Sequence, residues 1–169
     1  EAVTAIPSHA AHRPGATVAG AVLAHRTGTA TWITFNIGDS RVYLLRSGVL
    51  TQMSHDHSQV QALIDAGQLT RDQARRDPRK NVVTRALGAG LDQEAVPETR
   101  ITPAQNGDRL LICSDGLSDE LDDEALATVL GAGMRPQHTA EAAVAAALEA
   151  GGHDNTTALV VDLVPESDL

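Results

Sequence analysis

Three aspartates stand at similar places in the sequence, each beside an apolar segment that is typical of a β-strand. They are Asp56, Asp115 and Asp154. A packed strand holds its end at a fixed depth, so the ends of several strands can direct their carboxylates into one cleft. Clustered carboxylates repel one another unless cations lie between them, so a convergent set favours hard divalent ions such as Mg²⁺ or Mn²⁺. Glycines beside Asp115 and Asp154 let the backbone approach the ion or its waters closely.

Each of these aspartates also has a purely structural interpretation, as a helix N-cap or in an Asx-turn. Residues 38–40, with the sequence Gly-Asp-Ser, are interpreted as a tight hairpin turn. His55 and His57 flank Asp56 on one side of an extended segment; they could bind a metal or stay as solvated loop imidazoles, which we favour. Cys113 lies inside an apolar strand with no base nearby in sequence, which predicts a buried, unreactive thiol.

The hydrophobic pattern predicts the elements that must position these side chains. Strands are expected over residues 29–37, 41–46, 49–53, 109–113 and 156–164. Helices are expected over residues 16–25, 60–67, 70–76, 122–130 and 139–150. Short turns join the first three strands into an antiparallel meander, and strands do not alternate strictly with helices. The pattern therefore favours antiparallel sheets with helices packed outside over a doubly wound parallel sheet.

Composition narrows the class of protein further. The chain has 169 residues, of which 42% are hydrophobic and 21% charged, and this is typical of one globular domain. Its net charge of -9 disfavours nucleic acid and anionic membranes as partners, and 2% aromatic residues are too few for base stacking. The single cysteine excludes an internal disulfide, and no apolar run approaches the ~20 residues of a membrane span. No secretory leader is visible at Glu1, so we expect a cytoplasmic location.

Five motifs occur in a fixed order along the chain. They are NIGDSRVY (36–43), HDHS (55–58), TRALG (84–88), GDRLLICSDGL (107–117) and GGHDN (151–155). Together they closely resemble the bacterial form of the metal-dependent serine/threonine protein phosphatases of type 2C, the PPM family. The resemblance runs from about Gly15 to Val164. The ordered set is highly specific, although Gly-Asp-Ser alone is a weak signal.

The resemblance implies an α+β fold, in which a β-sandwich of two antiparallel sheets carries helices on both outer faces. It also implies Mn²⁺- or Mg²⁺-dependent dephosphorylation of phosphoserine and phosphothreonine proteins, the products of a serine/threonine kinase. Two metal ions, or three, would generate a hydroxide that attacks phosphorus in line without a phosphoenzyme. No side chain is then expected to be catalytic beyond the metal ligands.

The family's site residues carry over to this chain by motif. Asp115 and Asp154 resemble the carboxylates that bind the first metal. Asp56 resembles the residue that holds a third, looser ion together with Asp115. Asn155 is expected to orient Asp154, and Gly116 to lie beside the ligands without binding the ion itself.

Residues 58–82 resemble the mobile flap beside the family's active site. This segment is rich in basic residues within an acidic chain, and connecting segments of this kind often carry function. We expect Arg75, Arg76 and Arg79 to meet the phosphoprotein substrate.

Residues 15–164 would form the phosphatase-like domain, with a linker or partly disordered segment over 1–14 and a tail over 165–169. The family begins with an arginine-bearing strand, an Asn-Glu-Asp segment and an Asp-Gly-Met-Gly-Gly-like turn. These segments supply the aspartate that bridges the metals and the arginine that binds phosphate. Residues 1–14 contain no such aspartate, so we expect the sandwich and the second metal site to be incomplete at the N-terminus.

Three interpretations of this departure stay open. The chain is a piece of a longer phosphatase, a shortened inactive relative that binds partners, or a subunit whose sandwich a second chain completes. We favour the first, because Asp56, Asp115 and Asp154 are all retained. The alternative function is therefore a catalytically inactive binding or regulatory module. A weaker idea treats His55 and Asp56 as the metal pair of an all-helical phosphohydrolase, which the strand pattern disfavours.

Overall fold

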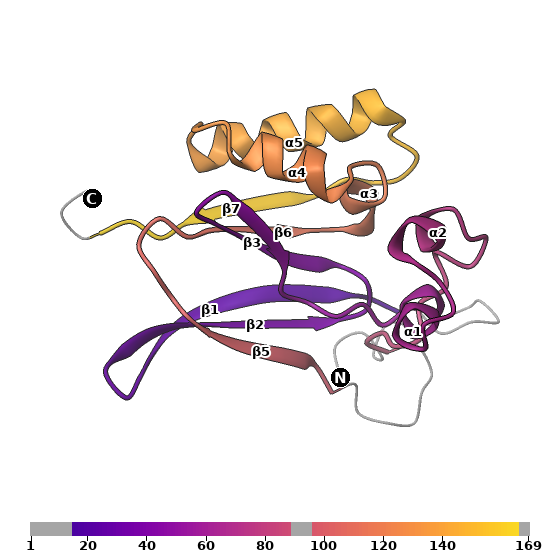
Figure 1. The fold of residues 1–169 in the computed structure, drawn as a ribbon, viewed down its shortest axis with the longest axis horizontal. Helices are drawn as coiled ribbons and strands as arrows, with labels where there is room; N and C mark the ends of the chain where they lie inside the picture. Colours follow the sequence, from indigo (N-terminus) through magenta and orange to yellow (C-terminus); the bar gives the residue numbers. More distant parts are fainter. Residues whose placement is uncertain (1–14, 89–95, 166–169) are drawn as a thin grey trace.

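The computed structural model describes residues 15–88 and 96–165, and these residues form two antiparallel sheets that face each other (Figure 1). The three-stranded sheet has the order β1 (Val18–Arg26), β2 (Thr29–Ile37) and β5 (Glu98–Pro103). The four-stranded sheet has the order β4 (Val49–Gln52), β3 (Arg41–Arg46), β6 (Arg109–Cys113) and β7 (Ala158–Asp162). The predicted antiparallel sandwich is therefore confirmed.

Helices lie over one face and at one end of this sandwich. α4 (Asp123–Leu130) and α5 (Pro136–Ala150) cover the outer face of the four-stranded sheet (Figure 1). α3 (Asp115–Ser118) follows β6 directly, while α1 (Gln59–Asp65) and α2 (Arg71–Arg75) lie at the end of the sheets. None of the helices in the described ranges is long and apolar enough to cross a membrane.

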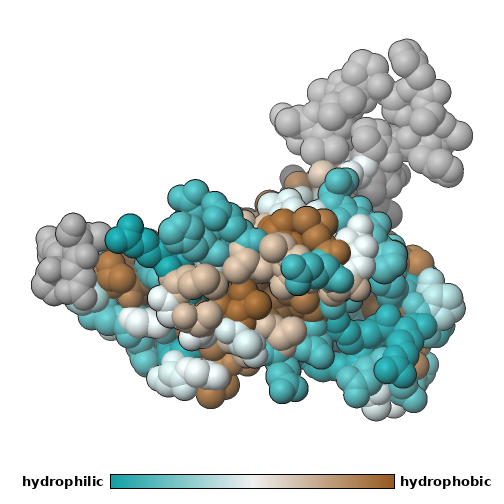
Figure 2. Space-filling model, turned by 90° about the horizontal axis from the view of Figure 1, so that it is seen from above, coloured by the Kyte–Doolittle hydropathy of each residue, from teal (hydrophilic) through white to brown (hydrophobic). Residues whose placement is uncertain are grey.

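The two outer faces differ in their cover. The family resemblance predicts helices on both outer faces of the sandwich. In the described part of the chain, helices pack on the outer face of the four-stranded sheet and not on that of the three-stranded sheet. On the other outer face, Val22 and Ile101 are 50% and 53% exposed. On the helical side, a shallow apolar groove between α5 and β7 is lined by Val144, Leu148 and Leu159, and hydrophobic surface gathers on this side of the molecule (Figure 2).

Two apolar clusters hold the layers together. One lies between the four-stranded sheet and its helices and includes Leu111, Leu117, Leu126, Leu130, Ala143 and Ala147. The other lies between the sheets and consists of Trp32, Val42, Leu44, Met53 and Leu110 with partly buried neighbours. Strand β3 serves both, because Val42 and Leu44 face the other sheet while Tyr43 and Leu45 face the helices. Because β3 and β6 are packed on both faces, the positions of their ends relative to the two sheets are fixed.

The helix predicted over residues 16–25 is wrong, because these residues form most of β1. β1 pairs along its whole length with β2 through a hairpin whose turn residues, Thr27 and Gly28, both have positive φ. A turn of this hand matches the twist of paired strands, so cross-strand pairing outweighs an apolar spacing that also fits a helix. The sequence pattern also misses β5, an edge strand that is mostly exposed. The other predicted strands and helices are confirmed to within a few residues at their ends.

Candidate active site

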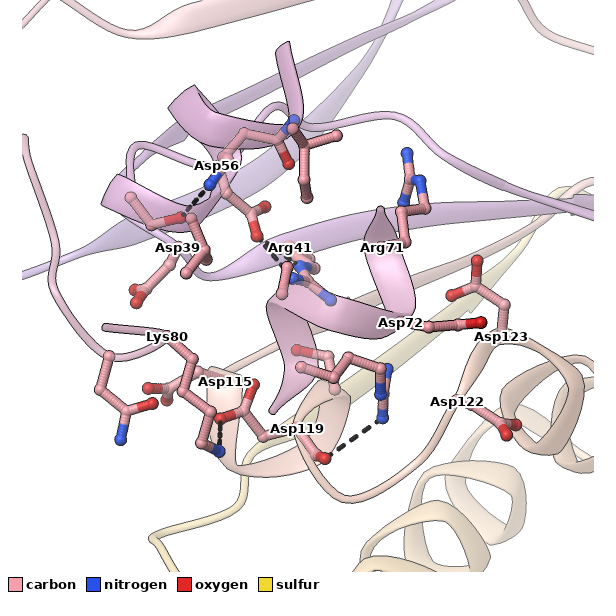
Figure 3. A pocket seen from close by; sticks show the side chains of 18 of the residues that line it. Asp39, Arg41, Asp56, Arg71, Asp72, Lys80, Asp115, Asp119, Asp122 and Asp123 are labelled. Carbon is pink, nitrogen blue, oxygen red and sulfur yellow. Dashed lines mark hydrogen bonds and ion pairs between the residues drawn. The ribbon is translucent and has the colours of Figure 1, made fainter. Parts of the chain in front are cut away.

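Segments far apart in the sequence meet at one end of the sandwich. Pairing of β3 with β6 places Arg41 opposite Cys113, so the turn before β3 lies beside the segment that follows β6. A pocket of about 270 Å³ opens there, next to the segment that carries α1 and α2 (Figure 3). Its lining includes the carboxylates of Asp39, Asp56 and Asp115.

Asp39 projects from the tight turn between β2 and β3, and hydrogen bonds fix that turn. The Gly38 N–H donates to His57 Nδ1 over 3.0 Å, and the His57 N–H donates to the Gly38 carbonyl over 2.9 Å. Asn36 Nδ2 donates to the same carbonyl over 3.1 Å. Gly38 has a φ of +98° and lies against Thr17, so any larger residue would be strained and would clash. The turn therefore holds Asp39 at the pocket wall.

The Asp39 carboxyl is partly buried and lies close to other negative charges. Burial, followed by the charges of Asp115 and Asp56, raises the pKa of Asp39 to about 6. Among the described residues, no lysine, arginine or histidine forms an ion pair with it. A divalent cation between Asp39 and Asp115 would remove the repulsion and keep both carboxylates ionised. Oxygen donors of this kind suit Mg²⁺ or Mn²⁺, so the pair fits a hard metal ion.

Asp115 is the first residue of α3, directly after the buried strand β6. Its Oδ1 accepts a hydrogen bond from the Gly116 N–H over 2.9 Å. The loop before β7 packs against this segment, because Ser114 Oγ donates to the Asn155 carbonyl over 3.2 Å and Thr156 Oγ1 to the Gly116 carbonyl over 3.1 Å. A Cβ at position 116 would clash with the Asn155 carbonyl, so this close approach requires glycine.

Asp154 lies in that loop, so the fold brings its segment next to that of Asp115. Its side chain is exposed, is not part of the pocket lining, and accepts a hydrogen bond from the Asn155 N–H over 2.6 Å. Asn155 reaches the Asp115 segment through its backbone carbonyl. Asp115 and Asp154 are therefore neighbours through their loops, while the carboxylate that faces Asp115 in the pocket is that of Asp39.

Asp56 lines the pocket, but its carboxylate is bound to neighbours within the protein. Its side chain is 4% exposed, and Oδ2 accepts from Arg41 Nε over 2.8 Å and from Arg41 Nη2 over 2.6 Å. Oδ1 accepts from Gln52 Nε2 over 2.9 Å. Because an arginine already neutralises Asp56, the structure offers Asp39 as the free partner of Asp115. The hairpin interpretation of residues 38–40 is incomplete, since it overlooked this carboxylate.

The two histidines of the HDHS motif have different surroundings. His57 is buried, and burial lowers its pKa. Its Nδ1 accepts from the Gly38 N–H over 3.0 Å, and Arg85 Nη1 lies 3.1 Å from its Nε2. His55 is exposed and its Nε2 lies 3.0 Å from Asp65 Oδ2. The solvated-loop interpretation therefore holds for His55 and is wrong for His57, and neither histidine lines the pocket.

Of the three arginines expected to meet the substrate, Arg75 lines the pocket and the other two do not. Arg75 Nη2 donates to the Asp119 carbonyl over 3.2 Å. Arg79 pairs with an aspartate of its own turn at 2.7 Å, and Arg76 is the residue that ends α2. Lys80 also lines the pocket, and its Nζ lies 2.6 Å from a carboxylate oxygen of Asp119.

The ligand set in the described part of the chain is partial. No group of three or more histidine, cysteine, aspartate or glutamate side chains within residues 15–88 and 96–165 is arranged to hold a metal ion. Cys113 is buried, and burial raises the pKa of its thiol to about 12, as predicted for an unreactive cysteine. The described residues thus contribute two facing carboxylates, Asp39 and Asp115.

Similar proteins are known. The chain matches a family model described as Protein phosphatase 2C over residues 2–150. It is 43% identical over 131 residues to the serine/threonine protein phosphatase PstP of Mycobacterium tuberculosis, covering 76% of this chain and 24% of that protein. It is 37% identical over 127 residues to the serine/threonine phosphatase stp of Listeria monocytogenes, covering 75% of this chain and 50% of that protein. The chain thus spans half or less of the length of these curated relatives.

Solved structures show the same fold. The crystal structure of Mycobacterium tuberculosis PstP/Ppp matches with a TM-score of 0.79 and 37% identity, over 88% of this chain and 60% of that one. Stp1 from Staphylococcus aureus matches with a TM-score of 0.81 and 28% identity, over 89% and 57%. The catalytic domain of PstP in complex with two manganese ions matches with a TM-score of 0.76 and 36% identity, over 89% and 60%. The predicted fold and family are confirmed, and the chain belongs to the protein phosphatase 2C family.

Proposed function

We propose that the protein containing this chain dephosphorylates phosphoserine and phosphothreonine in proteins, with Mn²⁺ or Mg²⁺ as cofactor. The observation that carries the proposal is the facing pair Asp39 and Asp115, because burial and the Asp115 charge raise the pKa of Asp39 to about 6. A carboxylate with a perturbed pKa in a pocket is typical of functional sites, and Asp39 forms no ion pair with a lysine, arginine or histidine among the described residues. The named phosphatase relatives and the manganese complex of PstP support the same chemistry.

In this proposal the chain's residues have distinct roles. Asp39 and Asp115 hold the ion, and Asp39 takes the position beside Asp115 that the sequence motif gave to Asp56. A bound divalent ion supplies an activated water and neutralises charge on the phosphoryl group. Asp154 is the third candidate ligand, because its loop is hydrogen-bonded to the Asp115 segment. Asp56 supports the site indirectly, by fixing Arg41 at the pocket wall.

Phosphate release from a phosphothreonine peptide, with and without Mn²⁺, tests the proposal on the full-length protein. We expect Mn²⁺-dependent release and a loss of about 100-fold or more in Asp115→Asn, since losing a ligand costs more than the ~10–100-fold typical of groups that orient ligands. Glu149→Gln, at an exposed position of α5, is the matched control and should keep full activity. Metal-independent release, or full activity of Asp115→Asn, would contradict the proposal.

A phosphatase-like binding module is the second candidate. It is favoured by the lack of a complete ligand cluster in the described part of the chain. A module of this kind should bind a phosphothreonine peptide in calorimetry and release no phosphate at any Mn²⁺ concentration. Turnover that follows Mn²⁺ binding would instead exclude the module.

A further inference from the structure

The HDHS motif, residues 55–58, lies beside the turn that carries Asp39, and its two histidines have no role in the chemistry proposed above. His57 is the buried histidine of this motif, and its ring does not line the pocket. A buried polar ring requires partners within the protein. His57 Nδ1 accepts from the Gly38 N–H over 3.0 Å, and Nε2 lies 3.1 Å from Arg85 Nη1. The ring therefore lies between the residue that precedes Asp39 and a segment 28 residues further along the chain.

The motif binds this turn on both sides of Asp39. Before Asp39, the Gly38 carbonyl accepts from the His57 N–H over 2.9 Å, while the Gly38 N–H donates to the His57 ring. After Asp39, the Arg41 guanidinium donates two hydrogen bonds to the Asp56 carboxylate (Figure 3). Asp39 lies between these two attachments, so its position depends on both of them.

Asp39 requires this support because a second carboxylate lies close to it. Burial, followed by the charge of Asp115, raises the pKa of Asp39 to about 6, so the two carboxylates repel each other when both are ionised. Repulsion moves charged groups apart when the backbone that carries them can shift. A shift of the turn would separate the buried Gly38 N–H from its acceptor in the His57 ring, which is unfavourable. The hydrogen bond therefore keeps the two carboxylates together before an ion binds, and such preorganisation favours binding.

We propose that His57 is a positioning residue for the metal site, and that its Nδ1 holds the turn of Gly38 and Asp39 where Asp39 faces Asp115. The inference rests on the function proposed above, since it takes Asp39 and Asp115 as the ligands. His57 contacts neither the ion nor the substrate, because its ring is not part of the pocket lining. Loss of the ring therefore weakens binding of the ion, whereas the protein loaded with metal keeps its rate.

Calorimetric titration of the metal-free, full-length protein with Mn²⁺ tests this role. The relevant binding step is the one that Asp39→Asn removes from the titration of the wild type. His57→Leu keeps an apolar side chain in the buried site and has no acceptor. In this variant we expect the Kd of that step to rise about 10-fold, the lower end of the effect typical of groups that orient ligands. At saturating Mn²⁺, kcat for a phosphothreonine peptide should stay within about twofold of the wild type, since the loss is in metal binding.

Two polar variants separate the hydrogen bond from the bulk of the ring. His57→Asn carries its amide oxygen at the position of Nδ1, so it accepts from Gly38 and should keep the Kd within about threefold of the wild type. His57→Gln places its amide near the position of Nε2 and should behave like His57→Leu. His55→Leu is the matched control and should leave the Kd unchanged, because His55 is the exposed histidine of the same motif and its ring pairs with Asp65.

A double variant distinguishes positioning of Asp39 from a general effect on the fold. In the Asp39→Asn background, His57→Leu should leave the remaining Mn²⁺ binding unchanged, since its effect passes through Asp39. A further loss in that background, an unchanged Kd in His57→Leu, or equal losses in His57→Asn and His57→Gln would overturn the positioning role. If circular dichroism shows His57→Leu to be unfolded, the comparison of the two polar variants decides. A wild type that binds Mn²⁺ and releases no phosphate would overturn the proposed function and leave this comparison intact.

Discussion

Two carboxylates at opposite ends of the four-stranded sheet have opposite surroundings. Asp108 precedes β6 and is fully buried. It accepts hydrogen bonds from Arg46 Nε and Nη2 over 2.7 Å each, and from Trp32 Nε1 and the Gln105 N–H over 2.9 Å each. Burial alone would raise the pKa of Asp108, but the bonds from Arg46, Gln105 and Trp32 outweigh burial and lower it.

Asp39, at the other end, has no comparable set of donors among the described residues. Burial and the charge of Asp115 raise its pKa to about 6. A carboxylate that stabilises the fold is surrounded by hydrogen-bond donors. A carboxylate that binds a metal ion lies beside another carboxylate, and their repulsion destabilises the fold when no metal ion is bound. The comparison distinguishes the two aspartates by their partners, since both residues are Asp in a turn next to a strand.

The largest expected effect concerns activity. Asp39→Asn should lower kcat for peptide hydrolysis by about 100-fold or more, because a neutral amide no longer offsets the charge of a divalent ion. Asp108→Asn should retain most of its kcat at temperatures where circular dichroism shows it to be folded, since it lies at the far end of the sheet. Equal losses in the two variants would break the distinction between the two carboxylates.

Stability should respond in the opposite way. Asp108→Ala should lower the free energy of unfolding by about 3 kcal/mol, because removing one partner of a buried ion pair leaves the other donors unsatisfied. Trp32 Nε1 and Arg46 both lose their acceptor in this variant. Urea denaturation measures the loss, and Asp65→Ala, which removes an exposed partner of His55, is a control that should change little. A loss as small as that of the control would show that the donors around Asp108 add little.

The fold could be predicted from the sequence where strands are buried on both faces. β3 and β6 were expected over the residues that form them, because an apolar run between turns has few other interpretations. The apolar residues of β1 fit both periods, so their spacing predicts a helix, and pairing with β2 decides for a strand. β5 is exposed and polar, so its strand depends on a partner far away in the sequence.

The site was predictable at Asp115 and not at Asp39. A buried strand before Asp115 and a glycine after it point to a carboxylate in a close-packed site. Asp39 and Asp56 look alike in sequence, since both follow strands in short polar turns. Arg41 lies two residues from Asp39, yet its guanidinium pairs with Asp56. Tertiary packing determines which carboxylate pairs with Arg41, and the spacing of residues in the sequence does not predict it.

A smaller effect should appear at Asp39 without metal. Asp39→Asn should raise the free energy of unfolding of the metal-free protein by about 1–3 kcal/mol at neutral pH, since each unit of pKa shift corresponds to about 1.4 kcal/mol. Thermal unfolding measures this, and Mn²⁺ should stabilise the wild type and not the variant. Glu149→Gln, at an exposed position of α5, is the matched control and should give a smaller change. Destabilisation by Asp39→Asn would show that Asp39 supports the fold after all.

The smallest expected effect is the pH dependence, where the two carboxylates should have slopes of opposite sign. The pKa of Asp108 is lowered in the folded protein, so its stabilisation is complete above the ordinary value of about 4 and is lost as the pH falls through the folded pKa. The pKa of Asp39 is raised to about 6, so in the metal-free protein its destabilising effect grows as the pH rises from about 4 to about 6 and is constant above that.

Urea denaturation of wild type, Asp108→Asn and Asp39→Asn across this pH range gives the contribution of each carboxylate to the free energy of unfolding, as the difference between wild type and variant. The difference between wild type and Asp108→Asn should shrink only in acid, and the difference between wild type and Asp39→Asn should shrink as the pH falls below about 6. If both differences in the free energy of unfolding changed with pH in the same direction, the two carboxylates would have pKa shifts of the same sign. The contrast in partners between Asp39 and Asp108 would then not distinguish them.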